Sequence, residues 1–210
     1  MAPPIVVTYN LAAAVTTSIV NAQNTVAAGV AFTLVTATVD AHQRRLLLTM
    51  TGNEASNTFT IVGTNEAGFP ITDAVTGVNN STTVSNLDFL TVTKFTALAA
   101  TGGTTSLGTY AVGDSLWNIM NWNAAPVNIE VSTVLQTGAA TWSVQYTYDD
   151  PNNLPSGVTF PTAFNHPTLI NCTASIDGPI NDPVTAIRLQ VVSGTGTVRM
   201  TIIQAGLGSP

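Results

Sequence analysis

The stretch from residue 45 to residue 108 constrains the fold most, because its hydrophobic pattern suits strands. Short runs in which apolar residues and threonines alternate are separated by clusters of Gly, Asn, Asp and Ser. Alternation with a period of two places successive side chains on opposite faces of a strand. Residues 65–68 separate the runs 59–64 and 69–76, which predicts a hairpin with a four-residue loop. The whole stretch predicts a Gly/Thr-rich β-meander.

The remainder of the chain has the same short runs, so we expect an all-β protein of two sandwich-like antiparallel modules with little or no helix. The composition changes near residues 110–114, where a Gly-rich segment ends. This change divides the chain into an N-terminal module, 1–111, and a C-terminal module, 112–210. All three tryptophans, Trp117, Trp122 and Trp142, follow the boundary and are expected to fill the core of the second module.

The last two apolar runs predict a hairpin around the turn at 193–196. Its register would place three pairs of apolar residues on one face: Ile187 with Ile202, Leu189 with Met200 and Val191 with Val198. The other face would carry two polar pairs: Gln190 with Arg199 and Arg188 with Thr201. A slip of one residue would mix the two faces, so the pattern favours this pairing.

Three segments of the first module resemble a pattern common in virion proteins of tailed bacteriophages. They are 61–73 (IVGTNEAGFPITD), 89–95 (FLTVTKF) and 102–108 (GGTTSLG). The chain departs from that pattern at Asn65, where an acidic residue is usual, and at Asp73, where Glu is usual. The segments 144–151, 186–189 and 197–206 are similar to the closing strands of small phage virion proteins. The resemblance of the first module lies within residues 45–108, about a third of the chain, and implies a virion structural protein.

Charged residues make up only 8% of the chain, and the net charge is −6 with five Lys and Arg. Ordinary soluble domains carry about 25% charged residues. Few surface charges suit a protein whose surface is covered by neighbours. Binding of nucleic acid requires a basic stripe, and the only basic cluster is Arg44-Arg45, which reads as the polar start of a strand. No run of 18 apolar residues and no basic leader occurs, so we expect no membrane segment and synthesis in the host cytoplasm.

No set of residues predicts catalysis, a bound cofactor or a structural metal. His42 and His166 are far apart in the sequence and belong to no metal or nucleophile motif, so replacing both with Asn should leave assembly unchanged. The densest group of oxygen ligands is Asp149, Asp150, Asn152 and Asn153. It could hold Ca²⁺, or its side chains could cap their own turn. Cys172, the single cysteine, is expected to be a small buried hydrophobe.

Two features point to contact with a partner. The segment 149–166 is rich in proline and is expected to be a long exposed loop, where binding residues are often placed. In the preceding strand, Trp142, Val144, Tyr146 and Tyr148 share one face. Their period of two is compatible with a buried core face or with a platform for carbohydrate, and the sequence leaves both open.

These features predict a decoration (cement) protein of a phage capsid, with the major capsid protein and further copies of this chain as partners. A homotrimer would cover exposed strand edges by closed symmetry, with the last hairpin's polar face or the 149–166 loop in the contact. A head–tail connector or tail protein is the alternative within the same class. A receptor- or glycan-binding module is the alternative from another class.

Overall fold

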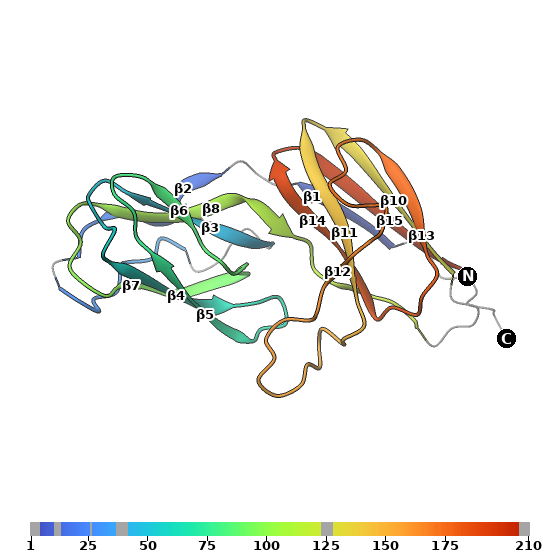
Figure 1. Cartoon of the computed structure of the whole chain (residues 1–210), viewed down its shortest axis with the longest axis horizontal. Helices are drawn as coiled ribbons and strands as arrows, with labels where there is room; N and C mark the ends of the chain where they lie inside the picture. Colours follow the sequence, from blue (N-terminus) through green and yellow to red (C-terminus); the bar gives the residue numbers. More distant parts are fainter. Residues whose placement is uncertain (1–4, 11–13, 26, 37–41, 123–127, 206–210) are drawn as a thin grey trace. The chain divides into compact units, whose positions relative to one another are not determined.

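The computed structural model describes residues 5–10, 14–25, 27–36, 42–122 and 128–205. This part of the chain contains fifteen strands and no helix, which confirms the predicted all-β fold. No helix long and apolar enough to cross a bilayer therefore occurs among these residues. The chain divides into two compact units (Figure 1). Residues 13–113 form one, which we call the inserted unit, and residues 1–12 together with 114–210 form the other, the terminal unit.

Two antiparallel sheets build the terminal unit. The first has the order β1 (Ile5–Asn10), β15 (Thr197–Ala205), β10 (Asn128–Thr137) and β13 (Ile176–Ile180). In the second, β11 (Ala140–Thr147) lies between β12 (Phe164–Asn165) and β14 (Ala186–Gly194), and β9 (Asn118–Ile119) pairs with β14. Alternate side chains of both sheets are fully buried, as in a sandwich: Ile129, Val131, Trp142, Val144, Ile187, Leu189, Val191, Val198 and Met200.

The first strand lies in the terminal unit, which corrects the assignment of residues 1–111 to one module. β1 pairs with β15, from Ile5 opposite Ile202 to Asn10 opposite Thr197. The chain then forms the inserted unit and re-enters the terminal unit at Asp114, the last residue of β8 (Thr105–Asp114). The change in composition near residues 110–114 marks where the chain re-enters the terminal unit. It carries no information about the distant strand with which β1 pairs.

The predicted C-terminal hairpin is wrong, although its alternation is right. β14 pairs with β11 and β15 pairs with β10, so the turn between β14 and β15 carries the chain from one sheet to the other. The apolar residues at alternate positions are all buried, but in opposite sheets: Ile187, Leu189 and Val191 in β14, and Val198, Met200 and Ile202 in β15. The predicted polar face does not exist for the same reason, since Arg188 and Arg199 belong to different sheets.

The connection between β10 and β11 makes a second crossing of this kind. The two crossings contact each other, because the backbone N–H groups of Thr195 and Gly196 both donate to the Ala139 carbonyl at 3.0 Å. Two such arches, one stacked on the other, close one end of the terminal unit.

The strands of the inserted unit pair in two groups. The first has the order β2 (Val15–Gln23), β8, β3 (Gln43–Met50) and β6 (Thr82–Val84), and the second has the order β5 (Pro70–Thr76), β4 (Thr58–Thr64) and β7 (Thr91–Ala97). An aromatic group lies in the core of this unit. The Phe95 ring centroid is 4.6 Å from that of Phe32 and 5.7 Å from that of Phe59.

The hairpin of β4 and β5 is confirmed, with Thr58 opposite Thr76 and Thr64 opposite Pro70. Its loop, residues 65–69, is one residue longer than predicted. The meander is wrong, because β4 pairs with β7 and β3 with β6. Alternation determines which side chains of a strand share a face. It does not determine the sheet, and successive strands here lie in different sheets, whose apolar faces cover each other.

Candidate functional site

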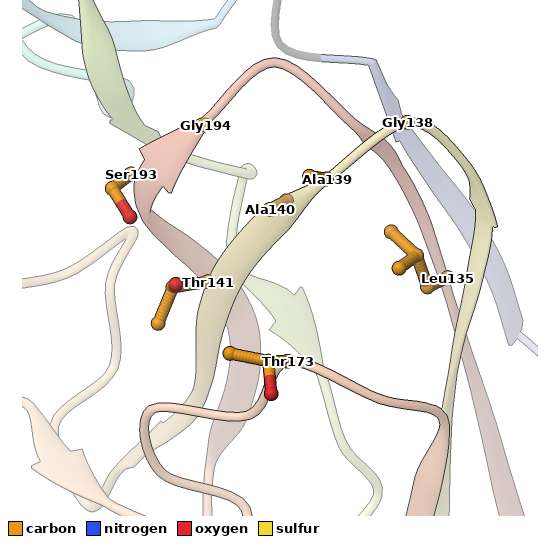
Figure 2. Close-up of a pocket in the computed structure, with 8 residues that line it drawn as sticks. All are labelled: Leu135, Gly138, Ala139, Ala140, Thr141, Thr173, Ser193 and Gly194. Atoms are coloured by element: carbon orange, nitrogen blue, oxygen red, sulfur yellow. The ribbon is translucent and has the colours of Figure 1, made fainter.

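The first hollow on the terminal unit lies beside the stacked arches. It has a volume of about 260 Å³ and is lined by small and uncharged residues: Leu135, Gly138, Ala139, Ala140, Thr141, Thr173, Ser193 and Gly194. Figure 2 shows Gly138 and Gly194 at the two crossings, and the Thr141 and Thr173 side chains on neighbouring segments. Three hydroxyl groups are the only polar side-chain groups of this lining, so it offers no acid, base or metal ligand.

Close backbone packing explains why these residues are small. Gly194 has φ of +89°, and a Cβ at this position would lie 2.3 Å from the Ala139 carbonyl oxygen. Only glycine combines this conformation with this approach. The hollow is therefore a consequence of the arches, and we do not assign it a ligand.

A second, smaller hollow of about 140 Å³ lies elsewhere on the terminal unit. Its lining combines one aromatic residue with prolines and polar groups: Tyr146, His166, Pro167, Pro179, Ile180, Asn181 and Asp182. Asn181 and Asp182 are exposed, and their side chains have no hydrogen bond to any residue that the structure describes. These two side chains are therefore free to bind a ligand.

Tyr146 also belongs to an aromatic cluster with Tyr148 and Phe164. The register places Tyr146 opposite Phe164, so both rings lie on the same face of β11 and β12. The centroids of the three rings are 5.7–5.8 Å apart in every pair. Tyr148 is 48% exposed and Phe164 is 42% exposed.

The structure answers the question that the period-two stripe left open. Trp142 and Val144 are fully buried and form core, whereas Tyr146 is half-buried and Tyr148 is exposed. The stripe is thus core at its start and surface at its end. Phe164, which the sequence analysis did not single out, completes the surface part, because β12 pairs with the end of β11.

Among the tyrosines, Tyr148 is in a perturbed environment. Partial desolvation raises the pKa of Tyr148 above 10.0, and the neighbouring Tyr146 and Asp182 raise it further. Tyr148 is therefore a neutral hydrogen-bonding group throughout the physiological range. The effect of Asp182 also indicates that this carboxylate lies close to the cluster.

His166 is buried, and both of its ring nitrogens are hydrogen-bonded. Nδ1 accepts from the backbone N–H groups of Thr168 at 3.2 Å and Leu169 at 3.1 Å. Nε2 lies 3.0 Å from the Pro179 carbonyl. Because backbone N–H groups only donate and carbonyls only accept, the ring is neutral with its proton on Nε2. His166 therefore holds a loop to β13 and is not placed for catalysis.

The other residues considered from the sequence do not converge on His166. His42 is half-buried just before β3, in the inserted unit. Asp149 accepts from the Thr162 N–H at 2.7 Å, and Asp150 accepts from the Asn152 N–H at 3.0 Å. These carboxylates cap the backbone of their own loop. No group of three or more His, Cys, Asp or Glu side chains suited to a metal ion occurs among the described residues.

Cys172 lies beside β11, on the edge away from β14. Its backbone forms an isolated bridge with Trp142, and its side chain is buried, as predicted. Burial raises the pKa of the Cys172 thiol above 9.0. A buried thiol with a raised pKa is a poor nucleophile.

The sequence did not predict that several charged side chains are buried or partly buried. Arg44 is fully buried, and its guanidinium donates to the Tyr110 carbonyl. In the terminal unit, Arg188 lies 2.8 Å from Asp114 and stacks over Trp117 at 4.5 Å from the ring centroid. The only available signal was the position of Arg188 within an alternating strand, which predicted an exposed side chain.

Glu54 and Asp73 hold turns of the inserted unit in a similar way. Glu54 Oε1 accepts from the Gly102 N–H at 2.6 Å. Asp73 Oδ2 accepts from the Asn86 N–H at 2.6 Å. Both carboxylates are nearly completely buried, and these backbone partners lie 48 residues from Glu54 and 13 residues from Asp73, so local sequence does not indicate the contacts.

No family model matches the chain, and no curated protein matches it. A search of solved structures returned the stem and receptor binding domain of the spike protein P1 from bacteriophage PM2, with 6% identity and 97% of each chain covered. The TM-score of this match is 0.18, which is too low to indicate a shared fold.

Proposed function

We propose that this chain is a structural component of a tailed-phage virion and that it binds the capsid shell as a decoration protein. One observation carries this proposal: the buried carboxylates and the histidine most suited to catalysis are hydrogen-bonded to the protein backbone. Glu54 and Asp73 bind backbone N–H groups, and His166 has both ring nitrogens bonded. Groups held in this way stabilise loops and do not contact a substrate.

The composition and the resemblance add support from the sequence. A surface rich in Thr, Asn and Gly with 8% charged residues provides little electrostatic repulsion between neighbouring molecules. Such a surface suits a protein packed against a lattice. The resemblance of residues 61–73, 89–95 and 102–108 to virion proteins of tailed phages favours the capsid as that lattice.

The copy number in purified particles tests the proposal. A decoration protein should be present in numbers on the order of hundreds, whereas a ring at a portal vertex has about a dozen copies, because each follows the symmetry of its site. Densitometry of virion proteins against the major capsid protein measures this ratio. A copy number near twelve would replace the decoration role with that of a connector or tail component.

We also propose a homotrimer, since three-fold positions of a capsid lattice accept a trimer by symmetry. The contact cannot use a joint face of Gln190 and Arg199, because these residues lie in different sheets. The proline-rich part of the loop 149–166, which precedes Phe164, remains the proposed contact. Light scattering should give three times 21.7 kDa for the free protein and for protein released from particles. A mass of 21.7 kDa in both preparations would exclude the trimer.

A further inference from the structure

The exposed aromatic cluster of the terminal unit is unusual for this chain. Phe59, Phe89 and Phe95 in the inserted unit have no exposed surface, whereas Phe164 is 42% exposed. Tyr148 beside it is 48% exposed. Adjacent exposed aromatic rings are enriched where proteins bind ligands or partners, since they offer a large apolar surface at a low cost in side-chain entropy.

Polar groups lie directly beside these rings. Tyr146 contributes both to the cluster and to the small hollow that contains Asn181 and Asp182. His166 in the same hollow is already bonded on both nitrogens, so the Asn181 and Asp182 side chains are the polar groups available to a ligand. Apolar surface with a few adjacent hydrogen-bonding groups is the usual composition of a small-molecule site.

The packing of the rings limits the kind of ligand. The Tyr146 and Phe164 rings are 5.8 Å apart and stacked at 22°, and Tyr148 contacts both. Rings in direct contact leave no space between them for a quaternary ammonium group, which an aromatic cage would surround. Tyr148 lies at 80° to Tyr146 and at 60° to Phe164, so the exposed parts of Tyr148 and Phe164 form an angled aromatic platform. A flat apolar face can lie on one of these rings and against the edge of the other.

Charge limits the ligand further. Asp182 is the acidic residue of this hollow, and no Lys or Arg is among the residues that line it. A carboxylate without a basic partner repels anionic ligands and accepts hydrogen bonds from hydroxyl groups. A sugar ring has both a C–H face for the platform and hydroxyl groups for Asn181 and Asp182.

We propose that Tyr148 and Phe164, together with Asn181 and Asp182, bind an uncharged sugar ring. The ring packs its C–H face on the aromatic platform and donates hydroxyl hydrogen bonds to the Asp182 carboxylate. This site rests on the aromatic cluster and the hollow, whereas the decoration role rests on the composition and the resemblance, so either proposal can fail alone.

The test uses the full chain, biotinylated and displayed on a multivalent support so that weak binding is detected. The probe is an array of neutral glycans and matched acidic glycans that carry uronic or sialic acid. We expect binding to neutral glycans and at least about tenfold weaker binding to the acidic partners, since Asp182 repels their charge. Binding to no glycan, or preferential binding to acidic glycans, would overturn the proposal.

Variants locate the site. Phe164→Leu keeps an apolar side chain but removes the flat ring, and should reduce binding at least about tenfold without changing the unfolding midpoint. Asp182→Asn should weaken the binding of neutral glycans. It should also reduce the difference in affinity between neutral and acidic glycans. Trp122→Leu removes an aromatic side chain that is 51% exposed elsewhere in the unit, and should leave binding unchanged.

The remaining results would count against the site. Equal binding by Phe164→Leu and wild type, or loss of binding only in Trp122→Leu, would overturn it. NMR titration with choline chloride tests whether the rings bind a cation instead. Saturable binding of choline without binding of neutral glycans would overturn the sugar site as well. Particles assembled with Phe164→Leu should keep the wild-type copy number, which separates a failure here from a failure of the decoration role.

Discussion

His166 is held by its own loop on one side and by β13 on the other. Thr168 and Leu169 supply N–H groups to Nδ1, and the Pro179 carbonyl accepts from Nε2. From the sequence we expected that Asn could replace both histidines without effect on assembly. The environment of His166 changes this expectation. Loss of a buried residue whose partners cannot reach water is costly even when the residue has no chemical role.

Replacing His166 with Asn should lower the free energy of unfolding by about 1–3 kcal/mol, because the shorter side chain cannot bond both the loop and β13. Urea denaturation followed by tryptophan fluorescence measures this change. Asn153→Ala, at an exposed position of the same unit, is the control and should stay within about 0.5 kcal/mol of wild type. Equal stability of His166→Asn and wild type would show that these hydrogen bonds do not hold the loop.

The raised pKa of Tyr148 predicts a loss of stability at alkaline pH. The unfolded chain releases the proton near 10.0, and the folded protein releases it at higher pH. The stability that Tyr148 contributes is therefore fully present below pH 10.0 and is lost as pH rises through the folded value. In urea titrations between pH 9 and 11.5, the free energy of unfolding of Tyr148→Phe should decline less than that of wild type. Parallel declines would contradict the assigned environment.

At the scale of elements, the two arches determine which strands become neighbours in the terminal unit. The turn between β14 and β15 has the length of a hairpin loop, yet it crosses between sheets. Contact with Ala139 of the other arch stabilises this crossing. The close approach of two backbones also places a strict limit on side-chain size at Gly194.

Gly194→Ala should destabilise the protein far more than Gly157→Ala. The difference between the two variants measures the steric contact within the arches. Both glycines have positive φ, +89° and +85°, so alanine meets the same conformational penalty of about 1 kcal/mol. A Cβ at Gly157 has no atom within 4 Å, whereas at Gly194 it would lie 2.3 Å from a carbonyl oxygen. Thermal unfolding monitored by circular dichroism measures both variants. Similar midpoints would argue against the stacked arches.

At the scale of the whole molecule, the first and last described strands, β1 and β15, lie in the same unit. β1 forms an edge of the sheet that contains β15, and residues 13–113 are inserted between β1 and the rest of the terminal unit. The stability of the terminal unit therefore depends on both ends of the chain. All three tryptophans belong to this unit, so fluorescence reports on its unfolding separately.

Deleting residues 1–10 should destabilise the terminal unit and leave the inserted unit intact. Removal of β1 exposes an edge of β15 and eliminates the half-buried Ile5 and Val7, a loss of about 2 kcal/mol or more. The tryptophan transition should move to lower urea concentration, while hydrogen exchange of β4 amides stays as in wild type. Equal loss of protection in β4 would show that the two units unfold together.

The sequence by itself determined the class of fold, the hairpin of β4 and β5, and which residues of β14 and β15 face the core. These features depend on local patterns: alternation of side chains and a turn between adjacent strands. The same patterns could show that the stripe from Trp142 to Tyr148 occupies one face, but not where that face passes from core to surface.

Only the tertiary structure decided which strands are neighbours. The sheets of β1 with β15, of β4 with β7 and of β11 with β14 join segments that are not adjacent in the chain. The aromatic cluster also required this information, because Phe164 reaches Tyr146 only through the pairing of β12 with β11. Alternation records how each strand divides its residues between two faces. It does not record the partner, because any strand with the same period satisfies the same pattern, and packing of the whole core selects among them.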